Sequence, residues 1–331
     1  MGSSDFAAPA LRALTQHPGV QIPLVITQPD RPRDRGKKLL PTPVKQFAES
    51  AGIPVMTPER LSDQTVLETL RKTAPDLIVV ASYGKILPKS ILEVPGCGCV
   101  NIHASLLPKY RGAAPIRWAI AAGEPETGVT LIYMGEGLDD GDMIAQRRVP
   151  ISSFVNAGAS VYLKHELSPE TRLTRVLAEA GAELLLEMLP RIADGTAPRI
   201  PQDEALATYT RKIAKEDAHI DFSQSEREVL RRIRIANPNP GAYAMIGDCR
   251  VKIVSARIPG GEELRGAMSE SLPGTEAGAE AGTVLSVSPQ GVFVQTGDGV
   301  LVIDAIGMPG KKPMLVADYL RGNAFPKGRL E

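Results

Sequence analysis

The sequence predicts an α/β protein with a doubly wound, mostly parallel sheet, followed by a small, OB-like β-barrel. Strand-like and helix-like patterns alternate over the first 150 residues, which is typical of such a sheet. Short, evenly spaced strand patterns separated by Gly, Pro and Ser begin near residue 220. A chain of 331 residues suits two domains. We therefore expect an N-terminal domain over residues 1–197, a linker over 198–219 and a barrel over 220–331.

The N-terminal elements follow from hydrophobic periodicity. The run Asp76-Leu-Ile-Val-Val80 is β-branched and apolar, as expected for a central parallel strand. A long polar loop separates the first predicted strand from the second helix. The predicted helices are residues 6–16, 44–50, 61–72, 86–92 and 113–122, and the predicted strands are 20–27, 53–55, 76–80, 97–102 and 127–134.

The second half changes character after Pro150. A long helix is expected over residues 172–189, and the Pro-rich, polar stretch that follows reads as a linker. Strands are expected at 251–256, 283–287, 291–296 and 300–306. The Gly-, Glu- and Ser-rich residues 262–282 indicate a loop between two of these strands.

Composition excludes several classes of protein. Lys plus Arg and Asp plus Glu each number 38, so the overall charge does not indicate a nucleic-acid binder. Three cysteines argue against a disulfide framework, and Cys97-Gly-Cys99 lacks the spacing of a zinc or redox motif. The N-terminus does not resemble a signal peptide, and no apolar run reaches 18 residues. We expect a cytoplasmic protein with no membrane contact and no metal.

Asn101 and His103 are the most informative pair in the sequence. They lie two residues apart at the end of a predicted strand, so both side chains project from one face of the sheet. Ligands bind beyond the carboxyl ends of such strands. The acidic loop at residues 137–142 offers a carboxylate to orient the imidazole. Spacing alone leaves Asp139, Asp140 and Asp142 open.

An amide, an imidazole and a carboxylate suit acyl transfer to an amine. An amide N–H can stabilise the negative charge that develops on a carbonyl oxygen under attack. An imidazole can relay the proton that the amine loses. A single histidine at a strand end is nevertheless more often structural. The dinucleotide-binding, P-loop and serine-hydrolase motifs do not occur in the sequence.

The segment from Asn101 to Pro115 closely resembles the folate-dependent formyltransferases. That resemblance implies that Asn101, His103 and Asp139, the last within Leu138-Asp139-Asp140-Gly141, are the catalytic residues. It implies 10-formyltetrahydrofolate as the formyl donor. It assigns to the folate carrier the four residues Ser105, Leu106, Leu107 and Pro108.

Further motifs resemble the methionyl-tRNA branch of that family. They include Arg111-Gly-Ala-Ala-Pro115 and the basic loop that begins at Thr27-Gln-Pro-Asp-Arg31. Residues 30–45 carry six basic and two acidic side chains, a net charge of +4, which suits contact with phosphates. The resemblance implies formylation of initiator methionyl-tRNA by a monomer. The residues expected to contact tRNA are Arg31, Arg33, Arg35, Lys37 and Lys38.

The sequence departs from the family pattern in three places, one of which is Asn239, where the family often has Trp. The family opens with a short β-strand before the Asp5-Phe6-Ala7 motif, and this chain has only four residues there. We expect unpaired backbone and a hole in the core at that position, and greater stability on upstream extension. The segment formed by residues 152–174 is longer than the corresponding segment is in most of the family. Two alternatives remain: a formyltransferase for a small amine, such as a nucleotide sugar or glycinamide ribonucleotide, and an inactive tRNA-binding protein.

Overall fold

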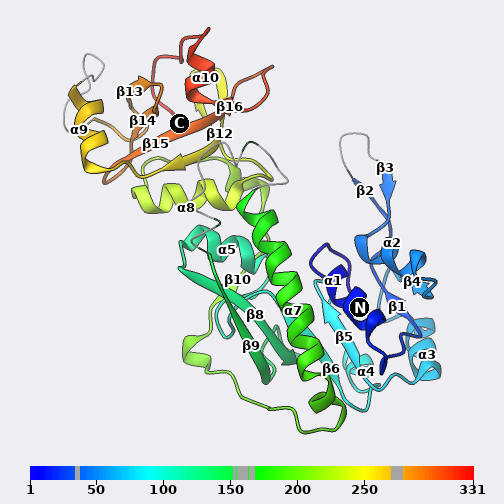
Figure 1. Cartoon of the computed structure of the whole chain (residues 1–331). Coiled ribbons are helices and arrows are strands. Elements are labelled where there is room, and N and C mark those ends of the chain that lie inside the picture. Colours follow the sequence, from blue (N-terminus) through cyan, green and yellow to red (C-terminus); the bar gives the residue numbers. More distant parts are fainter. Residues whose placement is uncertain (34–37, 152–153, 155–162, 164–167, 270–278) are drawn as a thin grey trace. The chain divides into compact units, whose positions relative to one another are not determined.

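The computed structural model describes residues 1–331 except 34–37, 152–153, 155–162, 164–167 and 270–278. It divides into two compact units (Figure 1). The first comprises Met1–Ile116, Glu126–Pro150 and Leu173–Thr210. The second comprises Arg117–Pro125, Ile151–Arg172 and Arg211–Glu331. The boundary between Thr210 and Arg211 falls within the segment expected to be a linker.

A four-stranded sheet is the centre of the first unit. Its order is β5 (Ile78–Ala81), β6 (Cys99–His103), β8 (Glu126–Tyr133) and β9 (Met143–Pro150). β5 and β6 are parallel, whereas β8 and β9 add antiparallel pairs. All five residues of β6 are buried, as expected for an inner strand. The predicted fold class is confirmed, with these antiparallel strands added to the parallel ones.

A separate parallel pair, β1 (Val25–Ile26) and β4 (Val55–Met56), extends this arrangement. Met1 and Gly2 lie between β1 and β5: Gly2 N donates to Ile26 O (3.1 Å), and Ala81 N donates to Met1 O (3.0 Å). The Ile26 carbonyl and the Ala81 N–H, which would have faced the additional strand, are therefore paired, so the expectation of unpaired backbone is wrong for these two groups. A cavity of about 50 Å³ is lined by both residues. The effect of upstream extension on stability stays a prediction.

Helices accompany the strands of the first unit. One of them, α7 (Pro169–Ala193), is long, and its residues from Leu173 onward belong to this unit (Figure 1). A Cβ at Gly181 would lie 2.7 Å from Ile102 Cγ2, so glycine lets α7 approach the sheet closely. The others are α1 (Ala8–Gln16), α2 (Pro43–Ser50), α3 (Gln64–Thr73), α4 (Lys89–Leu92) and α5 (Pro115–Ala122), the last of which runs into the second unit.

Three predictions for this unit need correction. The strand expected at residues 20–27 is reduced to β1, and the helix expected at 86–92 is reduced to α4, which Pro88 precedes. The expected polar loop contains an antiparallel hairpin, β2 (Arg31–Arg33) with β3 (Lys38–Leu40). Its Arg- and Pro-rich sequence lacks the apolar alternation by which strands are recognised.

The second unit holds a six-stranded antiparallel sheet, which fits the expected small barrel. Its path is β11 (Tyr243–Ile246), β12 (Cys249–Arg257), β15 (Val300–Gly307), β14 (Gly291–Gln295) and β13 (Val284–Ser288), and β16 (Met314–Leu315) pairs with β15. Leu330 N donates to Gly282 O (2.8 Å), and Glu331 N donates to Met245 O (2.7 Å). Residues 329–331 therefore join the two edges of this curled sheet, which limits its exposed backbone.

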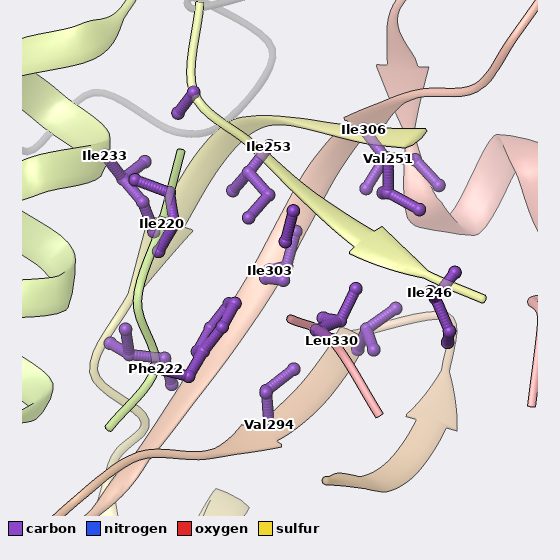
Figure 2. Close-up of a cluster of buried hydrophobic side chains, with 14 of the residues drawn as sticks. Ile220, Phe222, Ile233, Ile246, Val251, Ile253, Val294, Ile303, Ile306 and Leu330 are labelled. Atoms are coloured by element: carbon purple, nitrogen blue, oxygen red, sulfur yellow. The ribbon is translucent and has the colours of Figure 1, made fainter. Parts of the chain in front are cut away.

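Apolar side chains fill the interior of the curled sheet. Figure 2 shows Phe222 and Ile220 with Ile303 and Ile253 in this cluster, together with Ile233 of α8 (Glu226–Ala236). Helix α8 lies in the part of the chain that was expected to be β-rich, and no helix was predicted there. Ser225 caps it by accepting a hydrogen bond from Glu228 N (3.3 Å).

Two further helices belong to the second unit. Helix α9 (Gly261–Ser269) occupies part of the expected loop at 262–282, and α10 (Val316–Leu320) follows β16. Residues 270–278 of the loop lie outside the described residues. So does most of the longer segment at 152–174.

Candidate active site

The end of β6 brings an amide and an imidazole to one carboxylate. Asn101 Nδ2 donates to Asp139 Oδ1 (3.2 Å), and His103 Nδ1 lies 3.4 Å from Asp139 Oδ2. Gly112 N donates to the same Oδ2 (2.9 Å). All of these residues belong to the first unit. The structure thus gathers the three side chains, from segments 36 to 38 residues apart, into one trio.

The trio is largely shielded from water. Asn101 is 8% exposed and His103 is 6% exposed, while the Asp139 side chain is 16% exposed. Low exposure strengthens each electrostatic contact, because little water competes for the charged oxygens. Asp139 therefore has a small accessible edge within an otherwise protected group of polar atoms.

Both nitrogens of the His103 ring face oxygen acceptors. Nε2 lies 2.9 Å from Tyr110 O, and Nδ1 lies near Asp139 Oδ2. A neutral imidazole donates from only one nitrogen, whereas an imidazolium donates from both. Whichever ring nitrogen carries the proton, an acceptor oxygen lies within reach of it, and the two contacts together fix the plane of the ring.

Glycines and a strained residue set the direction of Asp139. Its φ is +52°, an uncommon value for a residue with a side chain. A Cβ at Gly141 would lie 1.8 Å from Tyr133 O, and one at Gly137 would lie 1.9 Å from Asp140 Oδ2. The backbone oxygen of Tyr133 makes glycine necessary at 141, whereas the exposed side chain of Asp140 could turn away from a larger residue at 137. This local geometry turns Asp139 inward.

The other two aspartates of the loop take different directions. Asp140 turns toward Gly137, and Asp142 lies 4.0 Å from Arg199. Of the three carboxylates that spacing left open, Asp139 is the one that contacts both Asn101 and His103. Its catalytic role, like those of Asn101 and His103, stays a prediction.

Two of the four residues expected at the folate carrier have internal structural contacts. Ser105 is fully buried, and its Oγ donates to Lys109 O (2.7 Å). Leu107 is 3% exposed, and its N donates to Thr130 Oγ1 (3.1 Å). Leu106 and Pro108 are half-buried and are the members better placed to touch a ligand. Contact with folate stays a prediction for all four.

Sequence reasoning missed a polar network that surrounds the buried Arg111 beside the trio. Arg111, 1% exposed, forms two hydrogen bonds with the Glu204 carboxylate, from Nη2 to Oε1 (2.7 Å) and from Nη1 to Oε2 (3.0 Å). Its Nη1 also donates to Tyr209 Oη (3.0 Å), and its Nε donates to Gln202 Oε1 (3.0 Å). The hydrogen bond from Arg111 holds the pKa of Glu204 below its usual value.

A short pair of parallel strands ties this network to the trio. β7 (Arg111–Gly112) pairs with β10 (Tyr209–Thr210), although the two lie almost 100 residues apart in the sequence. Gly112 has φ +100°, and a Cβ there would lie 2.5 Å from Thr210 O. Only glycine fits this approach, and the same residue supplies the N–H that binds Asp139.

The expected tRNA-contacting residues lie on or near the β2–β3 hairpin. Arg31 is exposed, and Arg33 and Lys38 belong to the two strands. Arg35 and Lys37 lie outside the described residues. Lys45, which contributes to the positive charge of this segment, forms an ion pair with Asp30 (2.8 Å). The hairpin and the trio are not joined by any hydrogen bond between described residues.

Among the residues that the structure describes, no group of three His, Cys, Asp or Glu side chains could hold a metal ion. None of the described helices is both long enough and apolar enough to cross a bilayer.

Two parts of the chain match family models of one class of transferase. A family model described as "Formyl transferase" matches residues 1–166, and one described as "Formyl transferase, C-terminal domain" matches residues 212–324. The chain belongs to the formyl transferase family.

Among individual proteins, the chain is similar over its whole length to methionyl-tRNA formyltransferases. The chain is 44% identical to the methionyl-tRNA formyltransferase of Moorella thermoacetica, over 100% of this chain and 97% of that protein. It is 42% identical to the methionyl-tRNA formyltransferase of Marinobacter nauticus, over 97% and 94%. A crystal structure of the N-formyltransferase from Helicobacter canadensis, in complex with folinic acid and dTDP-3-aminofucose, has a TM-score of 0.57 at 20% identity. It is matched over 91% of this chain and 96% of that one, and supports the fold alone.

Proposed function

We propose that this protein transfers the formyl group of 10-formyltetrahydrofolate to the amino group of methionyl-tRNA, specifically the initiator species. The single observation that carries the proposal is the trio, in which Asn101, His103 and Asp139 meet at the end of β6. The similarity to methionyl-tRNA formyltransferases over the whole chain supports the choice of amine.

The reaction joins the amine nitrogen to the formyl carbon. As the new nitrogen–carbon bond forms, the bond from that carbon to N10 of the folate breaks, and N10 keeps the electron pair. The amine loses one proton and N10 gains one, so protons balance. Negative charge builds on the formyl oxygen during the attack and must be stabilised by nearby donors.

Asn101 is assigned to that oxygen. One hydrogen of its amide binds Asp139, which fixes the plane of the group and aims the second hydrogen along a set direction. A donor fixed before reaction loses little entropy as charge develops, which is why preorganised amides are effective. Asp139 thus acts on the oxyanion through Asn101.

His103 is assigned to proton transfer or to an added hydrogen bond to the oxyanion. With Asp139 at one ring nitrogen and Tyr110 O at the other, the ring is held in a single orientation. An imidazole in that position can relay the proton that the amine loses toward N10, or can donate a hydrogen bond to the oxyanion.

The basic hairpin is assigned to the acceptor arm of the tRNA. The positive charge of residues 30–45 supports contact with phosphates, which supply much of the affinity of nucleic-acid complexes. Neutralising Arg33, Arg35, Lys37 and Lys38 together should raise KM for the tRNA more than tenfold at moderate salt, given about one phosphate contact each. The KM for the folate should not change.

The test is a formylation assay with 10-formyltetrahydrofolate and charged initiator tRNA, with product measured by acid gel or mass. Formylmethionyl-tRNA should accumulate, and Asn101→Ala should reduce kcat by about 100-fold or more while leaving the melting temperature nearly unchanged. Formylation of an amino sugar nucleotide or glycinamide ribonucleotide, with none of methionyl-tRNA, would establish the small-amine alternative instead. Absence of transfer to every amine would leave only a binding protein.

A further inference from the structure

We propose that Gln202 is a positioning residue that holds Asp139 in its working conformation. The inference rests on the proposed function, because it concerns the same site. Gln202 lies in a stretch that the sequence presents as a linker, 63 residues beyond Asp139. Its side chain nevertheless reaches the loop on which Asp139 stands.

The carboxamide of Gln202 makes three hydrogen bonds at once. Its Nε2 donates to Asp139 O (2.8 Å) and to Gly141 O (2.8 Å). Its Oε1 accepts from Arg111 Nε (3.0 Å). Both amide hydrogens are therefore directed at the backbone of the aspartate loop, and the oxygen is anchored on a buried guanidinium.

The hydrogen bonds from Gln202 stabilise the strained backbone of Asp139. The positive φ of Asp139 costs free energy. A residue keeps such a conformation only where several surrounding contacts hold it there. The two bonds from Gln202 grip the loop at the strained residue itself and two residues later. They limit rotation of the backbone that would swing the carboxylate away from Asn101 and His103.

The same network fixes the other side of the trio. Arg111, which anchors Gln202, is followed by Gly112, whose N–H binds the Asp139 carboxylate. Asp139 is thus held at its main-chain carbonyl by Gln202 and at its side chain by Gly112. Both contacts depend on Arg111, which binds the side chain of Gln202 and directly precedes Gly112 in the chain. The Glu204 carboxylate in turn holds the Arg111 guanidinium in place.

Gln202→Glu isolates the donating half of this arrangement. The substituted carboxylate keeps an oxygen for Arg111 Nε but turns its second oxygen toward the carbonyls of Asp139 and Gly141, which it repels. We expect kcat for methionyl-tRNA formylation to fall about 10- to 100-fold, since small misplacement of a reacting group has effects of that size. The KM values for both substrates should change little.

Gln295→Glu is the matched control. Gln295 is also half-buried, and its Nε2 also donates to two backbone carbonyls, Thr296 O (2.9 Å) and Gly299 O (3.1 Å). It belongs to the second unit. This variant should lower the melting temperature about as much as Gln202→Glu, with kcat retained.

A double-mutant cycle separates positioning from general stability. If Gln202 acts through Asp139, Gln202→Glu should add little to the loss already caused by Asp139→Asn. If Gln202→Glu folds poorly, Gln202→Met, which has similar length and no charge, should show the same non-additivity. Normal kcat in the Gln202 variants, or an equal loss in the Asp139→Asn background, overturns the inference. If wild-type protein fails to formylate methionyl-tRNA, the proposed function falls and takes this inference with it, whereas an active wild type with normal Gln202 variants leaves the function standing.

Discussion

Replacement of Asp139 by Asn should disable the site without unfolding the protein. Asparagine has the same size and adopts positive φ more readily than most residues, so the strained loop should be retained. The amide supplies one acceptor oxygen where the carboxylate supplies two. Either Gly112 N or Asn101 Nδ2 then faces an NH₂ group, and His103 loses its anionic neighbour.

The size of the effect follows from those contacts. A hydrogen bond to a charged group contributes about 1.5–3 kcal/mol, and an unsatisfied buried donor adds a cost of about 1–3 kcal/mol. About 3 kcal/mol in the transition state corresponds to about a 150-fold lower kcat/KM. The drop should appear mainly in kcat, because the lost contacts orient groups that act during the attack.

Steady-state formylation of methionyl-tRNA, together with a melting curve, measures this effect. Asp140→Asn is the matched control, since it makes the same change one residue away in a carboxylate that turns toward Gly137. That control should retain activity. An Asp139→Asn enzyme within about threefold of wild type, with the melting temperature unchanged, would refute the reasoning, because a 3 kcal/mol effect predicts a far larger loss.

Further predictions concern stability. Gly112→Ala should lower the free energy of unfolding by about 2 kcal/mol or more and abolish formylation, because its Cβ would collide with Thr210 O at 2.5 Å; urea denaturation and the formylation assay measure the two effects. The hydrogen bond from Arg211 lowers the pKa of Asp217 to about 2 from 3.8. Asp217, with Arg211, Ala214 N and Arg232 as its partners, should therefore stabilise the fold by about 2 kcal/mol above pH 5 and lose that contribution as pH falls from about 4 to 2, in wild type but not in Asp217→Asn. Leu330→Ala should cost about 2–5 kcal/mol, since Leu330 is buried where the curled sheet closes, and unchanged urea stability would contradict that role.

Much of the architecture was accessible from the sequence because its signals are local. The run 76–80 predicted an inner strand and became β5, and the period-two spacing of Asn101 and His103 placed both on β6. The choice of Asp139 among three aspartates was not local. It depends on a positive φ and on glycines whose contacts appear only when the loop is folded.

The polar network around Arg111 could not be predicted from the sequence, because it also depends on contacts between distant residues. Gln202, Glu204 and Tyr209 contact Arg111 over more than 90 positions, and β10 spans only two residues, too few for any periodic pattern. Helix α8 is different, since the Ser225-x-x-Glu228 cap followed by Val229, Leu230 and Ile233 was readable. The helix was missed because the region was expected to be β-rich.

The pairing of β7 with β10 has a consequence for synthesis of the chain. All three members of the trio have left the ribosome once residue 139 has emerged, but Gln202, Glu204 and Tyr209 follow more than 60 residues later. Until they dock, Arg111 lacks its counter-charge and the aspartate loop lacks its clamp. We expect a nascent chain of about 190 residues to hold every reactive group yet remain inert. Activity should therefore begin only when the segment that reads as a connector folds back.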